Sequence, residues 1–178
     1  MTTTLAVPRP VEGDCDPFYF TYINEIAADE DVLAVLADLE RTTPALLDPL
    51  TEAQAGHRYA PGKWTVREVM GHVTDAERVF AYRALTIARG DRTALPSFGE
   101  NEWAAVSNAD ARSLADLVGE LRAVRAASLA LFRSFGAAEW ERAGTASGKH
   151  VAVRALPYII AGHERHHVAV LRERYGIK

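Results

Sequence analysis

The sequence predicts an all-α protein, a four-helix bundle with long loops, and three observations carry this prediction. Apolar residues recur mostly at three- and four-residue spacing, the period of an α-helix, in four segments of similar length. Residues that typically begin or end helices flank these segments. Runs with the alternating pattern of a β-strand are scarce. Four long amphipathic helices pack most simply as one bundle with almost no sheet.

The chain divides into a short arm and one domain. Residues 1–16 contain Pro8, Pro10 and Gly13 and are expected to form a flexible, loosely attached N-terminal arm. Residues 17–178 are long enough for a single domain with a sizeable core. The apolar stretch 18–26 is expected to pack on this domain as a short helix or turn.

The first two long helices are predicted over residues 29–47 and 65–89. Pro44 should make the end of the first helix ragged, because proline lacks a backbone N–H. Thr65 and Glu68 have the spacing of a capping box at the start of the second helix. Gly90 can adopt the left-handed conformation that ends it.

The other two long helices are predicted from about Ser113 to Phe135 and from about Val153 to Arg174, with Gly176 closing the last. Residues 91–110 are expected to be a loop. A connection that contains Gly144 and Gly148 leads into the fourth helix.

Composition excludes several classes of protein. Twenty basic and 24 acidic residues give a formal charge of −4, which argues against a nucleic-acid binder that works by neutralising phosphates. No apolar run approaches the roughly 18 residues that span a membrane, and no secretory signal is visible, so a cytoplasmic location is expected. The single cysteine, Cys15, cannot form an intramolecular disulfide or a cysteine-rich zinc site.

Histidines are the candidate metal ligands. His163 and His167 lie four residues apart in the run GHERHH, so they project from one face of the fourth helix, together with Ile160 and Leu171. His72 lies on the inward face of the second helix, so a three-histidine site from facing helices is predicted. The alternative is that these histidines are hydrogen-bonded core residues, since an i, i+4 pair also arises by chance.

Two separated segments resemble one known family. The run YAPGKWTVREVMGHVTDAERVFAYRALTIARGD is similar to the second-helix region of the DinB superfamily, in the DinB-2 group that includes YfiT-like proteins. The run AGHERHHVAVLRERYG resembles the histidine motif of that family's fourth helix, and LPSFGENEW resembles the loop after its second helix. The resemblance spans about residues 18–175 and implies a four-helix bundle.

The resemblance also implies one divalent metal ion per chain, held by His72, His163 and His167. Arg165 departs from the apolar residue expected in close relatives, but it points away from the site. Three imidazoles leave the metal an open position, as in catalytic sites, where a bound water or thiol becomes the nucleophile. Zinc and nickel both suit imidazole ligands. Whether Glu68, Asp75 or Glu77 orients the rings stays open.

Three functions remain open. The resemblance implies either an enzyme that transfers a low-molecular-weight thiol such as bacillithiol to an electrophilic substrate, or a metal-dependent hydrolase. A non-catalytic metal-binding stress or interaction bundle is the third. Relatives in the family are often dimeric, which leaves a homodimer open. Candidate substrate-binding residues lie in the loop between the second and third helices, although an ordinary connecting loop would look the same; they are Phe98, Glu100, Asn101 and Trp103.

Overall fold

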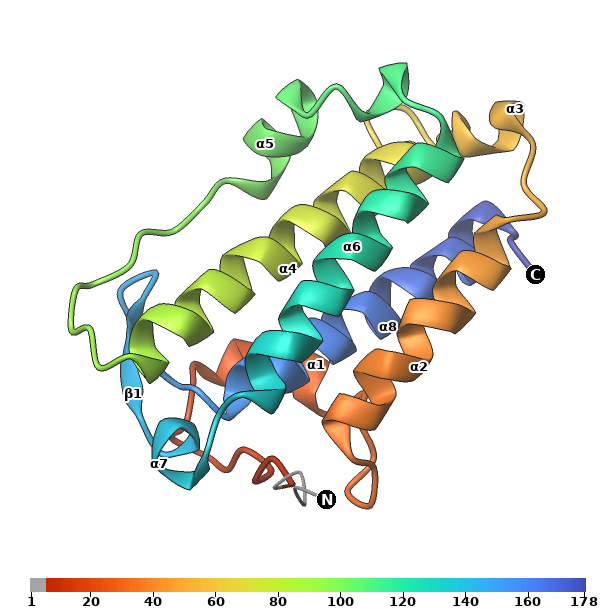
Figure 1. Cartoon of the computed structure of the whole chain (residues 1–178). Coiled ribbons are helices and arrows are strands. Elements are labelled where there is room, and N and C mark those ends of the chain that lie inside the picture. Colours follow the sequence, from red (N-terminus) through yellow and green to blue (C-terminus); the bar gives the residue numbers. More distant parts are fainter. Residues whose placement is uncertain (1–5) are drawn as a thin grey trace.

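Four long helices form the bundle in the computed structural model, which describes residues 6–178 (Figure 1). They are α2 (Val32–Leu47), α4 (Val66–Ala88), α6 (Leu114–Arg133) and α8 (Ala155–Tyr175). Helices α2 and α4 each pack against both α6 and α8, so the two helices that come first in the chain lie diagonally across the bundle. The predicted helical bundle is confirmed.

Side-chain caps fix where the long helices begin. Thr65 and Glu68 form the predicted capping box before α4, and Ser113 accepts from the backbone N–H of Asp116 before α6. Helix α2 begins three residues later than expected, because Asp31 caps it by accepting from the N–H of Leu33. It continues through Pro44 to Leu47 without the predicted ragged end.

The ends of the last two long helices also differ slightly from the prediction. Helix α6 stops two residues earlier, at Arg133. Helix α8 begins two residues later, and Pro157 falls in its first turn, where its missing N–H costs no hydrogen bond. Gly90 and Gly176 have φ angles of 82° and 69° after α4 and α8, as expected for helix stops.

Short helices occupy much of the chain between the long ones. The apolar stretch near the N-terminus forms a short helix, as expected, and the segment 91–110 is not a simple loop, since it contains α5. The short elements are η1 (Pro17–Tyr19), α1 (Phe20–Ile23), α3 (Glu52–Ala55), α5 (Glu100–Val106), η2 (Ala109–Ala111) and α7 (Ala137–Trp140).

A β-hairpin forms where only a connection was expected. Strands β1 (Ala143–Ala146) and β2 (Lys149–Ala152) pair antiparallel, with Ala143 opposite Ala152. The two turn residues, Ser147 and Gly148, both have positive φ angles, 55° and 72°, which is the requirement of a type I′ turn. Four-residue strands are too short to show a convincing alternation in the sequence, and so the pattern predicted no strand.

The described part of the N-terminal arm, residues 6–16, is anchored to the domain rather than loosely attached. Val7 and Cys15 are buried, and Cys15 forms a β-bridge with Val151. Asp14 accepts two hydrogen bonds from the Arg154 guanidinium, at 2.7 and 2.8 Å. These contacts join the arm to the hairpin end of the bundle. Residues 1–5 lie outside the described part.

A layer of buried polar side chains separates two apolar clusters in the core. One cluster, which includes Leu36, Phe80 and Ile159, lies toward the hairpin; the other, which includes Leu47, Met70 and Leu117, lies toward the opposite end. The buried polar residues between them on the long helices are Thr43, His72, Thr74, Glu77, Arg125, Ser128, His163 and Glu164. Among residues 6–178, no helix is long and apolar enough to cross a membrane.

Candidate metal centre

The three predicted histidines meet in the polar layer. The Nε2 atom of His163 lies 3.0 Å from Nε2 of His72 and 3.1 Å from Nε2 of His167. One ring nitrogen from each residue lies within 4.8 Å of the other two. Ligand nitrogens of a tetrahedral zinc site are about 3.3 Å apart, because Zn–N bonds are about 2.0–2.1 Å long. The donor set and its spacing therefore fit one divalent ion.

Helix packing brings these rings together. His163 and His167 stand one turn apart on α8, and the adjacent helix α4 presents His72 to them. Helix α1 closes a third side, since a Cβ built at Gly162 would lie 1.9 Å from the carbonyl oxygen of Tyr22. This close approach places the Tyr22 ring edge-on to His163, with 5.2 Å between ring centroids.

Burial keeps the three rings uncharged. It lowers the pKa of His72 to about 4 and that of His167 to about 3. Burial, followed by repulsion from its histidine neighbours, holds the pKa of His163 well below the ordinary value. A histidine must be neutral to coordinate a metal, so all three rings are in the ligand-competent form near pH 7.

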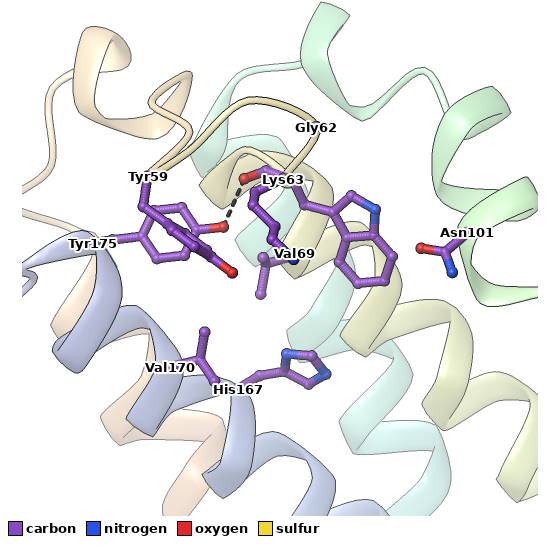
Figure 2. A pocket seen from close by; sticks show the side chains of 9 residues that line it. Tyr59, Gly62, Lys63, Val69, Asn101, His167, Val170 and Tyr175 are labelled. Atoms are coloured by element: carbon purple, nitrogen blue, oxygen red, sulfur yellow. Dashed lines mark hydrogen bonds between the residues drawn. The ribbon is translucent and has the colours of Figure 1, made fainter.

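A cavity of about 240 Å³ opens beside His167 (Figure 2). Tyr59, Trp64 and Tyr175 form part of its walls, and the ring centroids of Trp64 and His72 lie 4.8 Å apart. The Tyr175 hydroxyl donates to the Trp64 carbonyl at 2.6 Å, which ties the end of α8 to the segment before α4. The lining residues are Tyr59, Gly62, Lys63, Trp64, Val69, Asn101, His167, Val170 and Tyr175.

These aromatic walls were not singled out from the sequence. Tyr59 and Trp64 precede α4, whereas Tyr175 lies more than 100 residues later at the end of α8, and no local pattern links them. The one available signal was the run YAPGKW, which carries two of the three rings immediately before the helix that bears His72.

Residues of the predicted substrate-binding loop line two different pockets. Asn101 faces the cavity beside His167, as Figure 2 shows, whereas Phe98 and Trp103 line a separate groove. Glu100 is exposed at the start of α5. Residues two apart on a helix are rotated by about 200°, so Asn101 and Trp103 cannot serve one pocket.

Neighbouring charged residues have other partners. Glu68 belongs to the α4 capping box and accepts from Arg58, and Glu77 pairs with Arg125. Arg165 points away from the cluster and pairs with Glu30 at 2.7 Å, as expected. His166 is exposed and lies outside the three-nitrogen cluster.

The family model described as "DinB superfamily" matches residues 36–171, which is more than half of the chain. This protein belongs to the DinB superfamily.

Three known proteins are similar to this chain. A protein of Geobacillus thermodenitrificans (strain NG80-2) named "Putative metal-dependent hydrolase" is 28% identical over 158 residues, covering 83% of this chain and 87% of its own. A protein of the same description from Geobacillus kaustophilus (strain HTA426) is 26% identical over 177 residues, with 97% and 99% covered. The structure of YfiT from Bacillus subtilis, described as having an unusual four-helix bundle topology, matches with a TM-score of 0.71 and 19% identity, covering 96% and 95% of the two chains.

Proposed function

We propose that this protein is a metal-dependent hydrolase that holds one divalent ion on His72, His163 and His167. The observation that carries the proposal is the convergence of three neutral imidazole nitrogens beside an open cavity. A divalent metal bound there supplies Lewis-acid polarisation and a nucleophile at neutral pH. The names of the Geobacillus relatives support the same reaction class.

The residues around the cavity can bind and orient a small substrate. His72 and His163 are 6% exposed, whereas His167 lines the cavity, so a substrate approaches from the His167 side. Trp64, Tyr59 and Tyr175 present aromatic walls that exclude water. The Lys63 side chain descends into the opening in Figure 2, and its ammonium and the Asn101 amide offer donors to a carbonyl oxygen or a negative charge.

Transfer of a low-molecular-weight thiol is the second candidate, and the position of Cys15 bears on it. The only thiol of the chain is 5% exposed and lies on the hairpin, away from the three histidines. Burial, then the neighbouring carboxylates of Asp14 and Asp16, raises its pKa to about 11. Cys15 is therefore no nucleophile near pH 7, because the thiolate is the reactive form. A thiol such as bacillithiol would have to enter as a cosubstrate, beside an electrophilic partner.

The ligand set is tested by metal content. We expect His72→Ala, His163→Ala and His167→Ala each to abolish stoichiometric binding of zinc or nickel, measured by isothermal titration and elemental analysis. His166→Ala is the matched control, because its ring stands next to His167 outside the cluster, and it should bind normally. Normal metal binding in His167→Ala together with loss of binding in His166→Ala would show that His166 is the ligand and that the assignment to the His167 face of α8 is wrong.

Turnover separates the three candidate functions. We expect the zinc- or nickel-loaded protein to hydrolyse members of an ester and amide panel, and His167→Ala to lose this activity. Turnover that requires added bacillithiol or another small thiol would establish thiol transfer instead. Stoichiometric metal binding without turnover in either screen would indicate a non-catalytic metal-binding bundle.

A further inference from the structure

A second groove lies along α4, on the side covered by the segment before α5. Its volume is about 330 Å³, within the range of about 300–1,000 Å³ that is usual for small-molecule sites. Val79 and Tyr82 on α4 face Leu95, Phe98 and Trp103 across it. The exposed surface of the groove is mostly apolar, although Asp75, Arg78 and Ser97 also line it. The groove shares no lining residue with the cavity beside His167.

Arg83 lies in this groove and is nearly completely buried, at 2% exposure. Its Nη2 atom donates to the carbonyl oxygen of Pro96 at 2.9 Å and to the hydroxyl of Ser147 at 2.8 Å. Its guanidinium stands over the rings of Phe80 and Phe98, at 5.5 and 5.8 Å. The side chain is thus held in one place by α4, the segment before α5 and the turn of the hairpin.

The charge of Arg83 is not balanced within the described structure. Among residues 6–178, no carboxylate forms an ion pair with it, and the three N–H donors on Nε and Nη1 have no acceptor. Residues 1–5 contain no acidic side chain. The other deeply buried arginine, Arg125, is paired with both Glu77 and Glu164.

Within the described part of the chain, the buried side-chain atoms that lack a hydrogen-bond partner do not include Nε or Nη1 of Arg83, so Nε and Nη1 are open to solvent and an anion can reach them. Arginine stays protonated at any pH that a protein survives, and a buried charge is costly unless it is paired. The charge of the neighbouring Arg78 is already balanced, because this exposed side chain pairs with Asp75 and Glu120. A carboxylate accepts from a guanidinium at two donors at once, which matches the free donors of Arg83.

We propose that this groove binds a small organic carboxylate with an aromatic body. The carboxylate pairs with Arg83, and the aromatic body lies between Val79 and the rings of Phe98 and Trp103. Phe80 separates this site from the histidine cluster, since its ring lies 6.5 Å from that of His163 and stacks under Arg83. The proposal does not depend on a metal in the cluster.

The test uses chelator-treated full-length protein, so that a carboxylate cannot bind to a metal. Isothermal titration compares 4-phenylbutyrate with 4-phenyl-1-butanol, which has the same body without the charge. We expect the acid to bind at least tenfold more tightly than the alcohol. Equal affinities, or no binding of either compound, would overturn the proposal.

Variants locate the bound ligand. Arg83→Met should abolish the preference for the acid, whereas Arg83→Lys should retain part of it. Arg89→Met is the matched control, since Arg89 is an exposed arginine on the end of the same helix that also stands over a phenylalanine ring, that of Phe135. It should keep the full preference.

A second variant keeps the test decisive if Arg83→Met does not fold. Trp103 is 44% exposed, so Trp103→Ala should fold, and we expect it to weaken both compounds while the acid remains preferred. Unchanged affinities in Trp103→Ala, or an acid preference that survives in Arg83→Met, would show that the compounds do not bind in this groove.

Discussion

At the scale of single residues, burial sets the protonation of the three clustered histidines. The pKa of His72 is lowered to about 4 and that of His167 to about 3, against an ordinary value near 6.5. In the folded protein, protons therefore compete with a metal ion only well below the pH at which a free imidazole protonates. Metal binding should persist to about pH 5 as long as the fold does.

The same shifts predict how the stability of the metal-free protein depends on pH. Below about pH 6.5 the unfolded chain binds protons on these histidines and the folded chain does not, so the free energy of unfolding falls as pH decreases toward the folded pKa values. Each histidine contributes a slope of about 0.7 kcal/mol per pH unit at pH 6.5, which rises toward about 1.4 kcal/mol per pH unit near pH 5 as the unfolded chain becomes fully protonated. Urea unfolding of chelator-treated protein between pH 6.5 and 5 measures it.

Two variants test whether the clustered histidines cause this slope. His72→Leu removes one of the titrating rings and should give a shallower slope. His166→Ala alters an exposed ring outside the cluster and should keep the wild-type slope. A slope near zero in the wild type would mean that the rings are already protonated or solvated when folded.

At the scale of elements, the docking of α1 on α8 depends on Gly162. The Tyr22 carbonyl occupies the space that a side chain at this position would need. The contact brings the Tyr22 ring to His163, so a four-residue helix supplies one wall of the histidine cluster. The sequence of neither helix predicts this contact, because a glycine inside a helix can have several structural roles.

We expect Gly162→Ala to destabilise the protein by about 1–3 kcal/mol or more, because backbone must move to admit the methyl group. Gly119→Ala on α6 is the matched control. Nothing lies within 4 Å of a Cβ at that exposed position, so it should stabilise by about 0.5–1 kcal/mol through helix propensity. Urea unfolding compares the two, and equal effects would contradict the steric argument.

At the scale of the whole molecule, Arg125 joins all four long helices within the polar layer. From α6 it donates to Glu77 of α4 at 2.8 and 2.9 Å and to the Leu36 carbonyl of α2 at 2.9 Å. It also pairs with Glu164 of α8, the residue after His163. These bonds fix the position of α4 relative to α8, and with it the approach of His72 to the α8 histidines.

Arg125→Met should lower the free energy of unfolding by about 3–5 kcal/mol, because it leaves two carboxylates buried without their partner. Arg122→Met, an exposed change one turn earlier on α6, should have little effect. Thermal and urea unfolding measure both variants. A loss in Arg125→Met no larger than that in Arg122→Met would show that the buried charges are solvated.

The sequence by itself determined the elements with strong local signals. Helical spacing and caps at Thr65, Ser113, Gly90 and Gly176 predicted the four long helices, since these signals depend only on near neighbours. The i, i+4 spacing of His163 and His167 predicted that the two rings share a face. His72 lies on the inward face of its own helix, and the resemblance of two separated motifs to one family strengthened the case for joining it to this pair.

Only the tertiary structure decided the features that join distant parts of the chain. The aromatic cavity unites Trp64 and Tyr175, and the Arg125 network unites side chains from three helices, with no local pattern to mark either. The predicted substrate loop was divided for the same reason. Neighbours such as Asn101 and Trp103 point in different directions once they are helical, so the folded helix, and not proximity in sequence, assigns each to its pocket.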